Sequence, residues 1–127
     1  MSKYEDKVEH LLRKAGLTYK KEVSFPDLKD KDFLRFDFGI YKNQKLVGLI
    51  EVDGEQHFQS IEHFGGNEEF KRVKKTDRAK NRYCLMKKIP LFRVPFSEIE
   101  TFTLDKLPQF KVTSQYHNDN IINGRKN

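Results

Sequence analysis

The stretch FDFGIYKNQKLVGLIEVDG, residues 36–54, decides the fold that we predict for this chain of 127 residues. Apolar side chains alternate along residues 33–41 and dominate residues 46–53, which predicts two strands. The polar segment KNQK, residues 42–45, lies between them, and a short polar connection of this kind predicts a hairpin. The second strand ends in acidic residues, so ionisable groups are expected at the end of an otherwise apolar strand.

Helices and two further strands are expected around this hairpin. Ser2 and Glu5 have the spacing of a capping box, and the apolar spacing after them predicts a helix over residues 3–15 that Gly16 ends. The other expected elements are a strand over residues 18–25, a polar loop over 26–32, a helix over about 68–88 that Asn67 can cap, a strand over 91–94, and a helical segment over 98–107 that Ser97 can cap. The predicted fold class is α/β, a mixed four-stranded sheet flanked by helices, with an αβββαβ core and a C-terminal helical segment.

The length fits a single domain with its own core. Recognisable elements end near residue 107, so residues 1–107 are predicted to form this domain. Residues 108–127 are polar and rich in Asn, and we expect a loose tail or an arm that binds a partner.

Charge and cysteine content restrict the function further. Lys and Arg number 25 against 19 Asp and Glu, which gives a net charge of +6. Nucleic acid is the natural partner of such a chain, although a solvated surface rich in lysine has the same composition. Cys84 is the single cysteine, so an internal disulfide and a zinc site built on cysteine pairs are excluded, and burial as a small apolar residue is expected. No signal peptide or membrane span is recognised, which predicts a cytoplasmic protein that does not enter a membrane.

The register of the hairpin brings two acids together. Placing Phe36, Phe38 and Ile40 on one face, against the apolar set of the next strand, requires residue 38 to pair with 50, 36 with 52 and 37 with 51. Asp37 and Glu51 then become cross-strand neighbours, with Cβ atoms about 4.5–5.5 Å apart. Asp53 lies two residues further along, on the same side as Glu51.

Two carboxylates in this position repel each other, so something must offset the repulsion. A divalent cation would do so, and ligation by oxygen atoms alone is typical of Mg²⁺, for which Mn²⁺ can substitute. The alternative is that Asp37 and Glu51 are ordinary strand residues neutralised by Arg35 or by nearby lysines. The residues alone leave both interpretations open.

The helix over about 68–88 has a polar centre on its inward side, where Asp77 is followed by Lys80 or Asn81. A salt bridge between Asp77 and a nearby base would explain it, and so would a site at the sheet edge toward which these side chains point. Glu5, in the first helix, has a sufficient role in the capping box.

Four blocks in this order resemble a known family. FDFGIY, LIEVDGEQHF, FGGNEEFKRVKKTDRAKNRYC and IPLFRVPF are similar to endonucleases of the PD-(D/E)xK superfamily. Within it they resemble the phage and mobile-element, homing-endonuclease-like branch whose active site is similar to that of very-short-patch repair nucleases. The resemblance covers roughly residues 3–97. It implies a restriction-endonuclease-like fold and an Mg²⁺-dependent hydrolase that cuts DNA.

The superfamily's first acid corresponds to Asp37, preceded by Phe36 where the motif has Pro, and its second acid corresponds to Glu51. The motif lysine falls on Asp53, which cannot supply a positive charge. Its role must then pass to a neighbour, with His57, Gln56 and Lys80 as candidates, or Asp53 must serve as a further metal ligand. The related branch adds an acid from the first helix and a histidine after the third strand, which implies Glu5 and His57 here.

The resemblance implies that Mg²⁺ is held by Asp37, Glu51 and the Val52 carbonyl, with Asp53 as a further ligand, and that His57 moves a proton or binds phosphate. The bases expected to contact DNA are Arg35, Lys80, Lys74 and Arg78, with Asp77 supporting the site; most other bases of that helix are expected to form a solvated face.

Several functions within this resemblance stay open. They are nicking or double-strand cleavage by a phage or mobile-element enzyme, mismatch repair, resolution of junctions by a homodimer, and DNA binding without catalysis. A fifth is a subunit whose target is chosen by a partner protein through residues 108–127.

Overall fold

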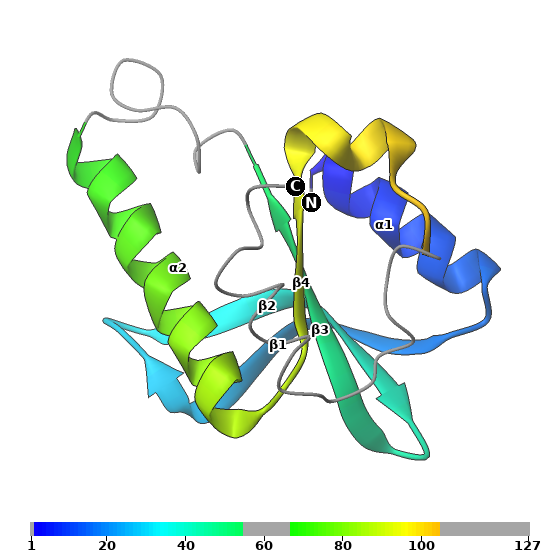
Figure 1. Cartoon of the computed structure of the whole chain (residues 1–127), viewed down its shortest axis with the longest axis horizontal. Coiled ribbons are helices and arrows are strands. Elements are labelled where there is room, and N and C mark those ends of the chain that lie inside the picture. The colour runs from blue at the N-terminus through cyan, green and yellow to red at the C-terminus, as the bar shows by residue number, and fades with distance from the viewer. Residues whose placement is uncertain (1, 55–66, 105–127) are drawn as a thin grey trace.

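The structure is a computed structural model, and it describes residues 2–54 and 67–104, without the side chain of residue 67. Its elements are α1 (Lys3–Lys14), β1 (Thr18–Lys29), β2 (Phe33–Lys42), β3 (Lys45–Asp53), α2 (Asn67–Lys87), β4 (Leu91–Pro95) and the 3₁₀ helix η2 (Phe96–Thr101). The sheet has the order β1-β2-β3-β4. The first three strands are antiparallel and β4 is parallel to β3, which confirms a mixed four-stranded sheet flanked by helices (Figure 1).

The helices cover opposite faces of the sheet (Figure 1). Helix α1 buries Val8 and Leu12 against Phe38 and Ile50, in a cluster that η2 also joins. Helix α2 buries Cys84 in a second cluster with β-strand residues, as the sequence predicts for this cysteine. Two apolar layers therefore fix α1 and α2 independently on the two faces.

Both helices end in the same backbone motif. In α1, Gly16 has φ +72°, and the N–H groups of Gly16 and Leu17 donate to the carbonyls of Arg13 and Leu12. This is a Schellman motif, for which glycine is the usual residue in the left-handed conformation. In α2 the equivalent position is Lys88, with φ +59°. The predicted ends of both helices are thus correct within a residue or two.

The hairpin of β2 and β3 has the predicted register from Phe38 to Ile40, and the register shifts between Ile40 and Tyr41. Phe38 pairs with Ile50, and the pairs continue toward the turn, where Asn43 and Gln44 both have positive φ, as a type I′ turn requires. The β2–β3 pairing ends at Phe38 and Ile50, so the expected pairs 36–52 and 37–51 are not formed. Beyond this point β2 pairs with β1 and β3 with β4, and β2 and β3 part.

Strands β1 and β2 reverse the faces of their side chains at Glu22 and Asp37. The two strands pair on either side of this position, but Glu22 itself has φ +56°. Phe38 lies in the cluster under α1, whereas Phe36 lies in the cluster under α2. The prediction that Phe36 shares a face with Phe38 and Ile40 is therefore wrong, because the left-handed backbone at Glu22 interrupts the pairing opposite Asp37 and the alternation breaks there.

Two other boundaries differ from the sequence prediction. Strand β1 continues to Lys29, through half of the expected loop over residues 26–32, and its pairing with β2 shifts between Ser24 and Lys29. The expected helix over residues 98–107 is a 3₁₀ helix that begins at Phe96, directly after Pro95, and ends at Thr101. Ser97 does not cap it, and residues 105–127, including the predicted tail, lie outside the described residues. Within the described ranges, no helix has the length and apolar character needed to cross a membrane.

Candidate active site

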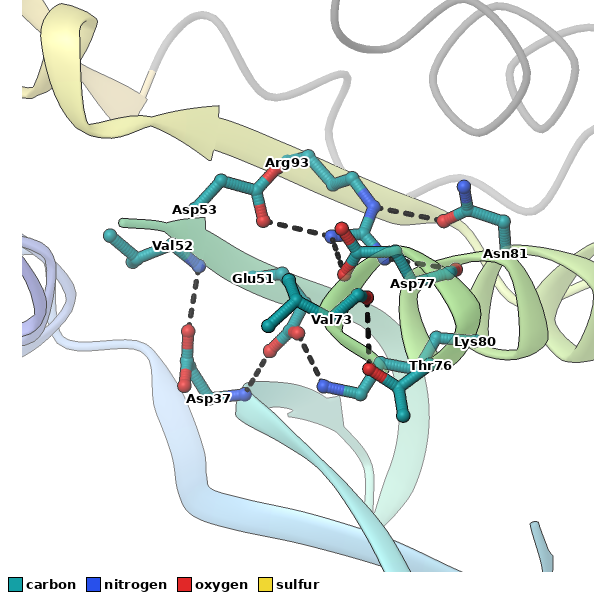
Figure 2. A network of polar contacts seen from close by, with 10 residues as sticks. All are labelled: Asp37, Glu51, Val52, Asp53, Val73, Thr76, Asp77, Lys80, Asn81 and Arg93. Carbon is teal, nitrogen blue, oxygen red and sulfur yellow. Dashed lines mark hydrogen bonds and ion pairs between the residues drawn. The ribbon is translucent and has the colours of Figure 1, made fainter. Parts of the chain in front are cut away.

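Asp37 and Glu51 meet where β2 and β3 part. The backbone N–H of Asp37 donates to Glu51 Oε1 at 2.8 Å, and the backbone N–H of Val52 donates to Asp37 Oδ2 at 2.7 Å (Figure 2). Each carboxylate thus accepts a hydrogen bond from a backbone N–H of the other strand. These two bonds follow directly after the last backbone pair of the two strands, and they hold Asp37 and Glu51 next to each other.

Lys80 reaches this pair from α2. Its Nζ lies 2.6 Å from Glu51 Oε2, and the side chains of Lys80 and Glu51 are only 14% and 5% exposed. The same ammonium group lies 5.4 Å from the centre of the Phe36 ring. An ammonium group has three N–H donors, so Lys80 can donate further hydrogen bonds beside Glu51. Of the three candidates for the role of the motif lysine, Lys80 is the one within the described residues.

On the other side of Asp37 the structure assembles an acidic cluster. One carboxylate oxygen each from Glu5, Glu22 and Asp37 lies within 4.8 Å of the others. Burial raises the pKa of Glu5, and the negative charge of Glu22 raises it further. The Glu5 backbone N–H also donates to Ser2 Oγ, so Glu5 belongs to the N-terminal cap and to this cluster at once.

The carboxyl group of Asp37 has a pKa raised to about 8, because it is buried and because the Glu51 charge is close. The hydrogen bond from Val52 and the charge of Lys80 oppose this rise without cancelling it. The raised pKa means that burial and the Glu51 charge outweigh the groups that stabilise negative charge at Asp37.

Arg93 of β4 forms the centre of a separate buried network (Figure 2). Its Nη1 lies 2.8 Å from Asp53 Oδ1 and 3.4 Å from Asp77 Oδ1, and its Nε donates to Asn81 Oδ1 at 2.9 Å. The side chains of Arg93 and Asp53 are fully buried. The charges of Asp53 and Asp77 raise the pKa of Arg93 despite its burial. The network therefore ties β3 and β4 to α2 and neutralises acids that water does not reach.

Two residues that the sequence analysis singled out, Asp77 and Asp53, lie in this network. Asp77 forms the predicted salt bridge with a nearby base, and the base is Arg93. Asp53 lies beside Arg93 and is not part of the cluster at Asp37, so its charge is engaged in the core. Sequence reasoning missed Arg93, although a charged residue inside the apolar strand LFRVP signals a buried ion pair.

The remaining candidates are dispersed. Arg35 and Arg78 are exposed, and Lys74 lies over the ring of Phe70, 5.3 Å from its centre. Gln56 and His57 lie outside the described residues. Glu22 was missed by sequence reasoning, and no sequence signal marks it, because its place beside Asp37 depends on the local break in strand alternation.

No family model matches this chain, no curated protein matches it, and no solved structure resembles it closely enough to count as a match.

Proposed function

We propose that this chain is a divalent-metal-dependent endonuclease that hydrolyses phosphodiester bonds of DNA, on a restriction-endonuclease-like fold of the PD-(D/E)xK superfamily. The observation that carries the proposal is the meeting of Asp37, Glu51 and Lys80 where β2 and β3 part. Two carboxylates and one amine, contributed by two strands and a helix, form the kind of set that positions a phosphate, a water molecule and a cation.

The residues present fit a hard divalent cation. All donors are oxygen atoms, as Mg²⁺ prefers, with Mn²⁺ as a substitute. The contact network also contains more acids than bases: its acids are Asp37, Glu51, Asp53 and Asp77, and its bases are Lys80 and Arg93. A divalent cation would compensate the excess negative charge.

The ligands would be Asp37, Glu51 and the carbonyl oxygen of Val52, and Glu5 is close enough to Asp37 to support them. When bound, the cation polarises the phosphoryl oxygen, lowers the pKa of a coordinated water molecule and stabilises the leaving oxygen. Lys80, held by Glu51, donates to the scissile phosphate or orients the attacking water. Asp53 has no such role in this proposal, because Arg93 engages it.

The test is cleavage of supercoiled plasmid DNA in Mg²⁺. We expect Asp37→Ala and Glu51→Ala each to lower the rate by about 100-fold or more, since each removes a metal ligand. Asp6→Ala is the matched control, because Asp6 is an exposed acid on α1, and it should cut at the wild-type rate. Cleavage retained by a folded Glu51→Ala protein refutes the assignment.

A second candidate is a DNA-binding module that has the fold without the catalysis. The observation favouring it is that Glu51 and Asp53 already have cationic partners within the protein. Assays with supercoiled, linear and branched DNA, in Mg²⁺ and in Mn²⁺, separate the two candidates. An enzyme cuts at least one of these substrates, whereas a binding module only slows the migration of the DNA. The same assay separates a nicking or repair enzyme from one that cuts both strands or resolves junctions.

We also propose that the protein acts in the cytoplasm, and that residues 108–127 contact a partner or a second copy. Measuring the molecular mass in solution with and without these residues tests the second point, since loss of the tail should then lower the mass of the assembly.

A further inference from the structure

Strands β1 and β2 extend beyond the break at Glu22 and Asp37 as a two-stranded arm, formed by residues 23–29 and 33–36. One face of this arm packs on α2, where Val23, Phe25, Leu34 and Phe36 join the second apolar cluster. Helix α1 packs on the other half of the sheet, against Phe38 and its neighbours (Figure 1). Within the described residues, no helix therefore covers the opposite face of the arm.

The side chains on this open face follow from the register. Residues 33 and 35 alternate with the half-buried Leu34 and the buried Phe36, which lie in the cluster under α2, so Phe33 and Arg35 point away from α2. Their cross-strand partners are Lys29 and Ser24, which lie on the same face. Phe33 is 45% exposed, and the Nζ of Lys29 lies 5.2 Å from the centre of its ring. The open face thus presents an aromatic ring between two cations, with a hydroxyl group beside them.

None of the four side chains on the open face carries a carboxylate. Two acids lie in the adjoining turn: Asp30 lies 3.5 Å from Lys75, whereas Asp32 accepts the backbone N–H of Phe33 and so lies next to the open face. Arg35 is two residues from Asp37, about 7 Å along the strand. A polymer chain lying on the open face would therefore run directly onto the candidate active site.

We propose that the open face formed by Ser24, Lys29, Phe33 and Arg35 is the surface that binds DNA, and that it takes a strand presenting an unpaired base. Arg35 and Lys29 contact phosphates on the side of the scissile bond away from α1, and the exposed base stacks on Phe33. Phosphate contacts of this kind position the strand without reading its sequence, and stacking on an aromatic ring is open to every base. The inference takes DNA as the ligand from the proposed function.

The groove on the other side of the arm fits DNA less well. It lies between the β1–β2 turn and the first half of α2, and it is lined by Asp30, Lys31, Glu68, Glu69, Lys71, Arg72 and Lys75. Two of its four cations are paired with neighbouring acids, since Arg72 lies 2.9 Å from Glu69 and Lys75 lies 3.5 Å from Asp30. Phosphates entering this groove would compete with these pairs, whereas the open face has no such pairs among its four side chains.

The test measures binding rather than cleavage. Fluorescence anisotropy of a labelled single-stranded oligonucleotide and of the matched duplex is recorded in EDTA and again in Ca²⁺. We expect the single strand to bind more tightly than the duplex in at least one of these buffers. Phe33→Ala should weaken this binding about fivefold or more, and Phe33→Tyr, which keeps a ring, should restore it. Arg35→Ala should weaken binding. It should also reduce the slope of the logarithm of the binding constant against the logarithm of the salt concentration by about one, as the loss of one phosphate contact does.

Two exposed residues away from the arm serve as controls. Met86 is 73% exposed on α2, and Lys45 is exposed at the far end of the hairpin. Met86→Ala and Lys45→Ala should bind as the wild type does, and circular dichroism confirms that every variant is folded. The proposal is overturned if DNA does not bind in either buffer, if the duplex is preferred, or if Phe33→Ala and Arg35→Ala behave like the controls. Cleavage is not measured in this test. If the wild type binds DNA and the variants lose binding as expected, but the protein never cuts DNA, the DNA-binding surface stands and only the proposed enzymatic activity is refuted.

Discussion

The carboxylates on the two sides of β3 have different partners. Toward α2 and β4, Asp53 and Asp77 share the buried guanidinium of Arg93. Toward β1 and α1, Asp37 lies beside Glu5 and Glu22, and its pKa is raised to about 8 by burial and by Glu51. Lys80 lies at the border, bound to Glu51. The comparison teaches that acids of the first kind are neutralised within the protein and hold the fold together, whereas those of the second kind are the ones that the proposed function assigns to an external cation.

The largest effect of a single substitution on stability is expected on the side of Arg93, where the carboxylates have a cationic partner within the protein. Arg93→Met removes the buried cation that contacts Asp53, and it should lower the free energy of unfolding by about 3–5 kcal/mol, as breaking a buried ion pair does. Urea denaturation measures this change. Arg13→Met, which removes an exposed partner of Glu9, should change the stability far less. If both variants are equally stable, the buried network does not have the structural role assigned to it.

An effect on activity rather than on stability is expected at the border. Lys80→Met should lower the rate of DNA cleavage by about 100-fold, the usual effect of losing one donor to the reacting group, while Lys80→Arg should recover part of the rate. Lys87→Met is the matched control on the same helix, because Lys87 pairs with Asp27 near the end of α2 and lies outside the Glu51 contact. Equal cleavage by the Lys80→Met and wild-type proteins would assign Lys80 to the fold alone.

A dependence of stability on pH, rather than an effect of a substitution, is expected on the side of Asp37. A carboxyl group whose pKa is higher in the folded than in the unfolded protein stabilises the fold most at low pH, and this contribution is lost as the pH rises toward the folded value. The metal-free protein should therefore lose stability between about pH 4 and about pH 8 through Asp37. Thermal unfolding of the wild type and of Asp37→Asn across this range isolates the contribution. A parallel pH dependence in the two proteins would show that Asp37 is not the group responsible.

The sequence predicted the regular parts of this molecule well. Helix α1 with its cap and the hairpin register at Phe38 and Ile50 were readable, because apolar spacing and turn chemistry are local signals. The buried ion pair of Asp77 was also anticipated, since a polar group inside an apolar helix face needs a partner.

The features that the sequence did not predict depend on contacts between segments that are far apart in the chain. The left-handed backbone at Glu22 reverses the faces of two strands, and no local pattern announces it. Phe36 was therefore assigned to the wrong face, and Glu22 was not recognised as a neighbour of Asp37. The choice of Arg93 as the partner of Asp53 depends on the parallel pairing of β3 with β4, which brings residues 51–53 and 93–95 into register.

The most direct test of the account is the binding of Mn²⁺, measured by isothermal titration calorimetry at pH 8 in the absence of DNA. The account predicts saturable binding to the wild type, weakened about tenfold or more in Asp37→Asn and in Glu51→Gln, since each loses a charged oxygen ligand, and unchanged in Asp6→Asn. Wild-type affinity in both ligand variants, or no saturable binding to the wild type, would contradict the claim that these two acids converge on a cation.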